Sequence, residues 1–141
     1  DDNYPQLHIT LNRVAEGEAE STVEIMEEVA KTVGQVKIEI DNFKCFKYND
    51  NFLVLDVNHT ASLEKLAKRL NNKLSNHGLS EFHITLISNF FAANPIPELD
   101  VEKLCLALDG QPQSIATYAQ SLELWRPTLD PKRKVTKSIN L

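Results

Sequence analysis

The amino-acid sequence predicts one α+β domain, in which strand-like and helix-like segments alternate along the chain. Residues 6–14 alternate apolar and polar side chains, as a half-buried strand does, and so do residues 36–43 and 81–88. Two segments between them, 21–33 and 62–76, carry apolar residues at helical spacing. The 141 residues can bury one core, and no linker or low-complexity tract divides them.

The two expected helices have recognisable ends. Ser21 and Glu24 form a capping box before the first apolar stripe, and Gly34 stands where a helix-ending glycine belongs. The second helix is expected to stop at Gly78. The remaining expected elements are a strand at 52–57 that forms a hairpin with 36–43, a helix at 101–108, and strands at 118–125 and 134–141.

Composition limits the partners and the compartment. The net charge of −5 argues against long nucleic acid, whereas a short oligonucleotide needs only a few local contacts. No apolar run is long enough to cross a bilayer. Cys45 and Cys105 follow no metal spacing and make no evident disulfide framework, so both are expected to be inert thiols in a reducing cytosol. The start at Asp1, without Met, predicts the end or an excised piece of a longer polypeptide.

One tetrapeptide, His-Ile-Thr-Leu, occurs twice, at 8–11 and at 83–86. Alternate residues of a strand share a face, so each histidine lies beside its threonine while the isoleucine and leucine point to the core. A single copy is a weak signal, because any amphipathic strand can contain it. A chance pair in equivalent strand contexts is expected in roughly one chain in a thousand or fewer.

Two histidines and two hydroxyls that converge are suited to breaking a phosphodiester by attack of a neighbouring ribose hydroxyl. One histidine takes the proton of the nucleophile and the other protonates the leaving oxygen, since the pKa of imidazole is near neutrality. Thr10 and Thr85 donate hydrogen bonds to the non-bridging oxygens. The scheme needs no metal and no cofactor. The sequence does not decide which of His8 and His83 is the base.

The repeated motifs resemble the two H-φ-(T/S)-φ motifs, with φ apolar, of the 2H phosphoesterase superfamily, and a looser resemblance covers residues 7–141. It implies a bilobal α+β fold, in which two pseudo-symmetric β-sheets line a central cleft and the helices lie outside. Residues 41–42 and 53–57 are similar to small viral members from coronaviruses and toroviruses. That similarity implies a metal-independent 2′,5′-phosphodiesterase, which degrades 2′,5′-oligoadenylate in the host cytosol and so prevents activation of the antiviral nuclease RNase L.

Other functions stay open. The first is an RNA-processing 2′,3′-cyclic nucleotide phosphodiesterase of the same superfamily, and the second is a catalytically idle 2H module that binds nucleotides. A structural strand protein with a coincidental repeat is the third. Many family members have a strand and a helix before the first motif, whereas seven residues precede His8 here. Either that segment is absent from this chain, or the helix at 101–108 takes its place.

Aromatic side chains are candidates for stacking on an adenine base. Tyr48 and Trp125 are the preferred pair, and Phe43, Phe46 and Tyr118 are the alternatives.

The other polar candidates are weaker. The basic run at 132–134, near Lys137, faces the phosphates of the substrate or is a solvated turn, and the turn is favoured. His59 and His77 are expected to be structural, as lone histidines usually are. The protein is expected to act as a monomer.

Overall fold

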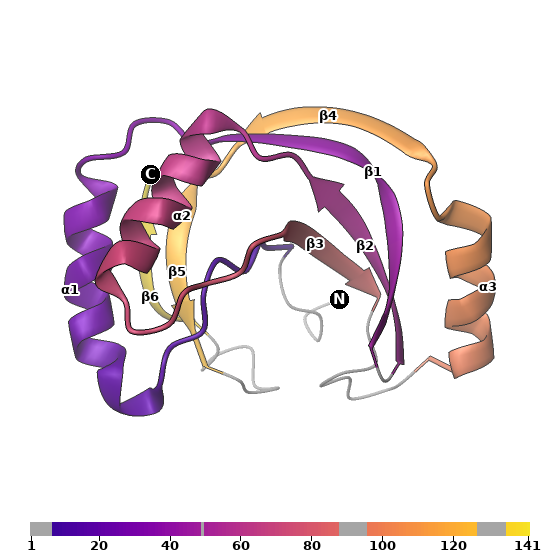
Figure 1. Cartoon of the computed structure of the whole chain (residues 1–141), viewed down its shortest axis with the longest axis horizontal. Coiled ribbons are helices and arrows are strands. Elements are labelled where there is room, and N and C mark those ends of the chain that lie inside the picture. Colours follow the sequence, from indigo (N-terminus) through magenta and orange to yellow (C-terminus); the bar gives the residue numbers. More distant parts are fainter. Residues whose placement is uncertain (1–6, 49, 88–95, 127–134) are drawn as a thin grey trace.

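In the computed structural model, which describes residues 7–48, 50–87, 96–126 and 135–141, the chain forms three α-helices, a four-stranded antiparallel sheet and a two-stranded sheet (Figure 1). The predicted α+β class is therefore confirmed. In chain order the elements are η1 (a 3₁₀ turn, Glu16–Glu18), α1 (Ala19–Ala30), β1 (Lys37–Tyr48), β2 (Asp50–Val57), α2 (Ala61–Lys73), β3 (Phe82–Ile87), α3 (Glu98–Leu108), β4 (Pro112–Tyr118), β5 (Ser121–Trp125) and β6 (Val135–Asn140).

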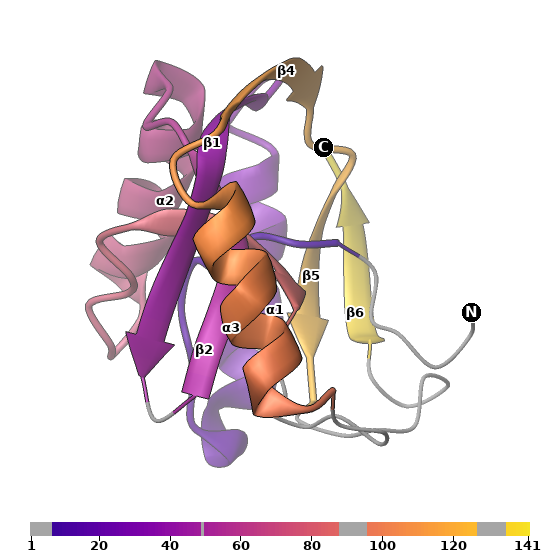
Figure 2. The same cartoon turned by 90° about the vertical axis from the view of Figure 1, so that its right-hand side faces the viewer.

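The strand order of the larger sheet is β3-β2-β1-β4, and β5 pairs with β6 in the smaller one. Helices α1 and α2 lie side by side at one end of the molecule, and α3 lies at the opposite end (Figures 1 and 2). Strand β3 forms one edge of the larger sheet, yet it lies near the middle of the molecule, between β2 and β5. Segments that approach β3 therefore meet near the centre of the fold.

Two apolar clusters hold the elements together. The main core lies between α1, α2 and the two sheets, and the smaller cluster lies under α3. Each fully buried Val, Leu or Ile side chain contributes about 1.5–3 kcal/mol. The buried members of the main core are Met26, Val29, Val33, Val36, Ile38, Ile40, Leu55, Val57, Leu63, Leu66, Ala67, Leu70, Phe82, Ile84 and Leu122, and those of the smaller cluster are Leu53, Val101 and Cys105.

Strand β1 contains a β-bulge that keeps its apolar residues on one face. The register shifts between Ile40 and Asn42, in the pairing with β2 and also in the pairing with β4. Ile38 precedes the shift and faces the main core, and Phe43 follows it and packs against the same core. Because one extra residue reverses the alternation of side chains, the apolar face continues past the bulge.

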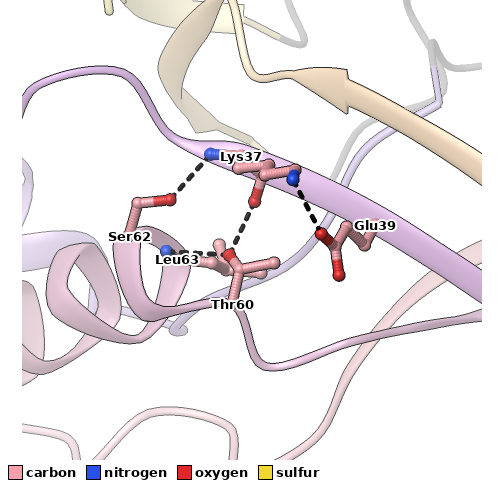
Figure 3. A network of polar contacts seen from close by, with 5 residues as sticks. All are labelled: Lys37, Glu39, Thr60, Ser62 and Leu63. Atoms are coloured by element: carbon pink, nitrogen blue, oxygen red, sulfur yellow. Dashed lines mark hydrogen bonds and ion pairs between the residues drawn. The ribbon is translucent and has the colours of Figure 1, made fainter.

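Polar contacts join the start of α2 to the start of β1 (Figure 3). The Thr60 hydroxyl accepts a hydrogen bond from the Leu63 amide at 3.3 Å, as an N-cap does, and donates one to the Lys37 carbonyl oxygen at 2.7 Å. The Ser62 hydroxyl accepts from the Lys37 amide at 2.7 Å. The Lys37 ammonium pairs with Glu39 at 3.0 Å. The hydrogen bonds satisfy backbone groups of both elements and fix the start of α2 against the start of β1.

The expected ends of the first helix are wrong. Ser21 lies inside α1, where its hydroxyl donates to the Glu18 carbonyl oxygen at 3.0 Å, so it forms no capping box with Glu24. Gly34 lies beyond the helix and does not adopt a left-handed conformation. The physical reason is local hydrogen bonding: η1 extends the helix upstream, and two amides beyond its end bond to the Val29 carbonyl oxygen at 3.0 and 3.2 Å.

The late part of the chain contains one more strand than predicted. The expected strand at 118–125 is confirmed in part as β5, and the additional strand, β4, lies before it at Pro112–Tyr118. β4 has little apolar alternation because most of its side chains are exposed, so its position comes from pairing with β1. The predicted helix at 101–108 and the strand at 134–141 are confirmed as α3 and β6.

The prediction that the two cysteines are unpaired is wrong. Cys45 of β1 and Cys105 of α3 form a disulfide bond across 60 residues of sequence. The spacing of two cysteines does not reveal a pair, because the fold decides which segments meet. The Cys45 amide also donates to the Asp109 carboxylate at 2.9 Å, just beyond the end of α3. Helix α3 is therefore fixed to the hairpin strand both covalently and by a hydrogen bond.

Candidate active site

The two His-Ile-Thr-Leu segments pair with each other. Ile9 and Ile84 form an isolated antiparallel bridge, on the side of β3 away from β2; Ile84 belongs to the main core and Ile9 packs against it. In an antiparallel pair the neighbours of bridged residues also face each other, so His8 lies beside Thr85. By the same rule the threonine of the first motif lies beside His83. The four polar residues thus form a square, with the histidines on a diagonal of about 7–8 Å between Cα atoms.

The larger sheet adds two rows of side chains to this square. Asp56 of β2 is opposite His83, and Asn42 of β1 is opposite Asp56. In the next row Lys44 of β1 and Thr85 of β3 flank a buried valine of β2. Side chains of directly opposite residues share a face of the sheet. This surface is called the histidine face, and its members are His8, Thr10, His83, Thr85, Asn42, Lys44, Phe46 and Asp56.

His83 is in a partly desolvated position. The residue is half-buried, and its Nδ1 atom is buried without a hydrogen-bond partner among the described residues. Burial lowers the pKa of His83 below its ordinary value of 6.5, because the charged imidazolium loses water. The carboxylates of Glu81 and Asp56 oppose this shift in pKa, and the charges of His8 and Lys44 add to it. The lowered pKa favours the neutral form of His83, which is the form that accepts a proton.

Each histidine has an aromatic neighbour. Trp125, the last residue of β5, lies against His8 with ring centroids 4.2 Å apart and planes inclined by 45°. Phe46 of β1 lies against His83 at 5.4 Å in an edge-to-face arrangement. The Lys44 ammonium lies 4.9 Å from the centre of the Phe46 ring. Both sheets therefore supply side chains to the region around the motifs.

The other predicted stacking residues are distributed over the fold. Tyr48 ends β1, and its side chain lies outside the described part of the structure. Phe43 packs against both apolar clusters, so it is not a stacking surface of this site. Tyr118 pairs with the first residue of β1, at the end far from the hairpin turn. The basic run at 132–134 lies outside the described residues.

Of the two remaining histidines, His59 has a structural environment, as predicted. Its Nδ1 atom pairs with the Glu64 carboxylate, and its ring packs on Phe82 with centroids 4.6 Å apart. His77 is exposed in the segment between α2 and β3, where its structural role stays a prediction. Lys137 pairs with Glu27 of α1 at 3.5 Å, which occupies its ammonium away from the histidine face.

Sequence reasoning did not find Lys44, Asn42 or Asp56 as neighbours of the motifs. Asn42 and Lys44 stand two residues apart, as residues on one face of a strand do. The alternation in the first half of β1 does not continue past Ile40, because the bulge there adds one residue. The shared face of Asn42 and Lys44 was therefore not recognised from the sequence. Asp56 is the single charged residue in an otherwise apolar stretch of β2, which is the usual sequence sign of a strand with one polar position on its outer face.

The first motif is held in place by α2 and by the segment after it. The Asn12 amide donates to the Asn71 side-chain oxygen at 2.7 Å, and the Leu79 amide donates to the Leu11 carbonyl oxygen at 3.0 Å. Gly78 has a φ of +82°, and a Cβ atom there would come within 2.2 Å of the Asn71 side chain. A side chain at position 78 would therefore be strained and would displace the Asn71 amide that holds Asn12, just after the first motif.

The two best-formed hollows of the described surface are lined by residues outside the histidine face. One, of about 270 Å³, lies between α1 and α2 and is lined by Glu28, Val29, Thr32, Arg69, Asn72 and Lys73. It contains no histidine and no member of the histidine face. Within the described ranges, no group of three or more His, Cys, Asp or Glu side chains is placed to hold a metal ion.

Comparison with known proteins adds no relative. No protein-family model matches the chain, and no curated protein matches it. Among the residues that the structure describes, no helix is long and apolar enough to cross a membrane.

Proposed function

We propose that the chain is a metal-independent 2′,5′-phosphodiesterase of the 2H phosphoesterase type, with His8, His83, Thr10 and Thr85 as its catalytic residues. The observation that carries this proposal is the pairing of the two motifs through their isoleucines. It sets two imidazoles on one diagonal of a square and two hydroxyls on the other. A phosphate bound over the square has a proton acceptor on one side and a proton donor on the other.

The reaction is an internal transfer at phosphorus. The base takes the proton of the 3′-hydroxyl next to the 2′,5′ linkage, and the 3′-oxygen then bonds to phosphorus. The bond from phosphorus to the 5′-oxygen breaks, and the acid protonates that oxygen. The products are a 2′,3′-cyclic phosphate and a 5′-hydroxyl, and no water is consumed. Thr10 and Thr85 donate hydrogen bonds to the non-bridging oxygens as their charge increases.

We assign the base to His83 and the acid to His8. Burial lowers the pKa of His83, which favours the neutral form that a base needs. His8 is the more exposed of the two and stands across the square from His83, on the side of the leaving 5′-oxygen.

The proposed substrate is a 2′,5′-linked oligoadenylate, and the proposed consequence is that host RNase L stays inactive. The resemblance to small viral members supports this choice, and the net charge of −5 favours a short oligonucleotide over a long one. We further propose that Trp125 stacks on a base, that the two sheets belong to two lobes, and that the protein acts as a monomer in the host cytosol. Disulfides are reduced in the cytosol. Activity there must accordingly not depend on the Cys45–Cys105 bond.

The test offers 2′,5′-linked and 3′,5′-linked oligoadenylates in parallel, with EDTA present, to the native protein and to the His8→Ala and His83→Ala variants. The matched control is His77→Ala, which removes an exposed histidine that belongs to neither motif. Only the 2′,5′ linkage is expected to be cut, giving 2′,3′-cyclic phosphate ends. Each motif variant is expected to lose about 10²–10⁴-fold in rate, and the control none.

Other outcomes favour other functions. Opening of 2′,3′-cyclic nucleotides without cleavage of either oligomer favours the RNA-processing function. Binding of 2′,5′-oligoadenylate without any cleavage favours the idle nucleotide-binding module. Loss of activity in His77→Ala equal to that in His83→Ala contradicts a role for the motifs.

A further inference from the structure

The surroundings of the two histidines are built from opposite sides of the molecule. Trp125 reaches His8 from β5, and Phe46 reaches His83 from the β1–β2 hairpin. β5 and the hairpin lie on opposite sides of β3 (Figures 1 and 2). A phosphate between the histidines therefore has one aromatic ring on each side.

We propose that Phe46 and Lys44 form a second nucleotide subsite, opposite the subsite at Trp125. The ligand is then a linear oligonucleotide with a base on both sides of the bound phosphate, rather than a nucleoside cyclic phosphate with one base. The choice of a nucleotide as ligand rests on the proposed function. The existence of two subsites is tested by binding alone.

The contacts of Lys44 fit such a subsite. Its ammonium lies 4.9 Å from the centre of the Phe46 ring and 4.0 Å from the Glu81 carboxylate, and its side chain is 39% exposed. Neither contact is short, so the ammonium can leave both for a phosphate oxygen. Lys44 also stands in the row of the histidine face next to that of His83, so its charge lies within electrostatic reach of the proposed phosphate position.

Binding exchanges one partner of Phe46 for another. A base that stacks on the ring needs the face that the ammonium covers. When Lys44 moves to the phosphate, the cation–π contact is replaced by an ion pair, and the vacated face receives the base. Stacking and charge neutralisation are thereby coupled at one position of β1.

The experiment measures dissociation constants by calorimetry with a ligand that cannot be cleaved. The ligand is the 2′,5′-linked adenosine dimer whose 2′-linked residue lacks the 3′-hydroxyl, so the attacking nucleophile is absent. Two analogues lack either one base or the other. The protein variants are Phe46→Leu and Lys44→Gln, and the matched controls are Tyr118→Leu and Lys37→Gln, which alter an exposed aromatic residue and a paired lysine at the far end of β1.

We expect Phe46→Leu to weaken binding of the dimer about tenfold. The same substitution is expected to weaken one single-base analogue and to leave the other unchanged. Lys44→Gln is expected to lower the slope of log K against log salt by about 0.7, as the loss of one phosphate contact does. Both controls are expected to bind like the native protein.

Two results overturn the inference. In the first, the native protein binds the dimer no more tightly than either single-base analogue. In the second, Phe46→Leu and Lys44→Gln leave the affinity and its salt dependence unchanged. A failed cleavage reaction with the expected binding pattern instead overturns the catalytic proposal alone, so the two failures are distinguishable.

Discussion

The two copies of one tetrapeptide occupy different surroundings. The copy at 83–86 lies within β3, where it pairs with β2 along its length, and its histidine is half-buried. The copy at 8–11 joins the sheet through a single bridge, and its histidine is exposed. Identical sequence thus gives the same functional groups twice, while long-range contacts give them unequal solvation. In the proposed reaction, that inequality separates the base from the acid.

The supports of the two copies differ as well. Behind the second copy, β2 and β1 form a continuous ladder, and the disulfide at Cys45 fixes β1 to α3. The first copy depends instead on side-chain amides, with Asn12 bonded to Asn71 next to the Gly78 turn. The first histidine is therefore expected to be the more easily displaced.

The largest expected effect separates the roles of the two histidines. The substrate pair is a 2′,5′-linked adenosine dimer and adenosine 2′-(4-nitrophenyl phosphate), whose leaving group departs without a proton. With the dimer, His8→Ala and His83→Ala each lower kcat by about 10³-fold. With the nitrophenyl ester, His8→Ala loses little, because no acid is needed, while His83→Ala keeps its full loss.

The same assay can contradict the assignment of His83 as the base and His8 as the acid. Equal losses on the nitrophenyl ester mean that the unequal solvation of the histidines has no chemical consequence. A large loss in His8→Ala with a small one in His83→Ala reverses the assignment. The His77→Ala variant shows whether any change comes from the removal of an imidazole as such.

The support of the second copy is tested by opening the disulfide. Closing a loop of 60 residues stabilises the native state by about 4 kcal/mol in the loop-entropy account. Cys105→Ser is therefore expected to lower the free energy of unfolding by that amount, measured by urea titration. Native protein in dithiothreitol is the matched control and is expected to match the variant. The variant and the reduced protein keep their activity at 25 °C if the sheet ladder alone positions His83. Loss of that activity contradicts action in the cytosol, where disulfides are reduced.

The support of the first copy is tested with two glycines of similar conformation. Gly78 and Gly110 have φ values of +82° and +78°, but only at Gly78 does an added Cβ meet another side chain, that of Asn71. Gly110→Ala is expected to cost roughly 1–2 kcal/mol of unfolding free energy from backbone strain. Gly78→Ala adds the clash and is expected to cost roughly 2–4 kcal/mol and to lower kcat as well. Equal effects on kcat contradict the role of Asn71 in positioning His8.

Much of the fold follows from local patterns in the sequence. The hairpin, α2 and β3 were predicted because each carries its buried residues at a regular spacing, as Leu63, Leu66 and Leu70 do. In these elements the local sequence pattern and the tertiary packing favour the same secondary structure, so the pattern alone predicts them. The repeat predicted two histidines and two hydroxyls that converge, whereas the bridge between the two isoleucines is known only from the structure.

Other features depend on contacts between distant segments. β4 has few buried side chains, so only its pairing with β1 reveals it. The disulfide joins segments whose meeting no spacing predicts. The contact of Phe46 with His83 depends on the bulge near Asp41, which changes the face of every later residue of β1. For the candidate site, the sequence predicts the motif residues, while the neighbours that tune them come from the fold.

The smallest expected effect is a pair of opposite shifts in the pH profile. A base must be neutral, so kcat/KM rises as the pH rises through the pKa of His83, which burial holds below 6.5. The Glu81 carboxylate raises this pKa, so Glu81→Gln moves the acid limb to lower pH. The Lys44 ammonium lowers it, so Lys44→Gln moves the limb to higher pH.

These shifts are measured twice, as kcat/KM against pH and by NMR titration of the His83 ring without ligand. The titration isolates the pKa from any change in substrate binding at Lys44. Shifts of the same sign in the two variants contradict the assignment of the acid limb to His83. If the acid limb of the profile moves in neither Glu81→Gln nor Lys44→Gln, it belongs to a group other than His83. The base is then His8, which lies across the square.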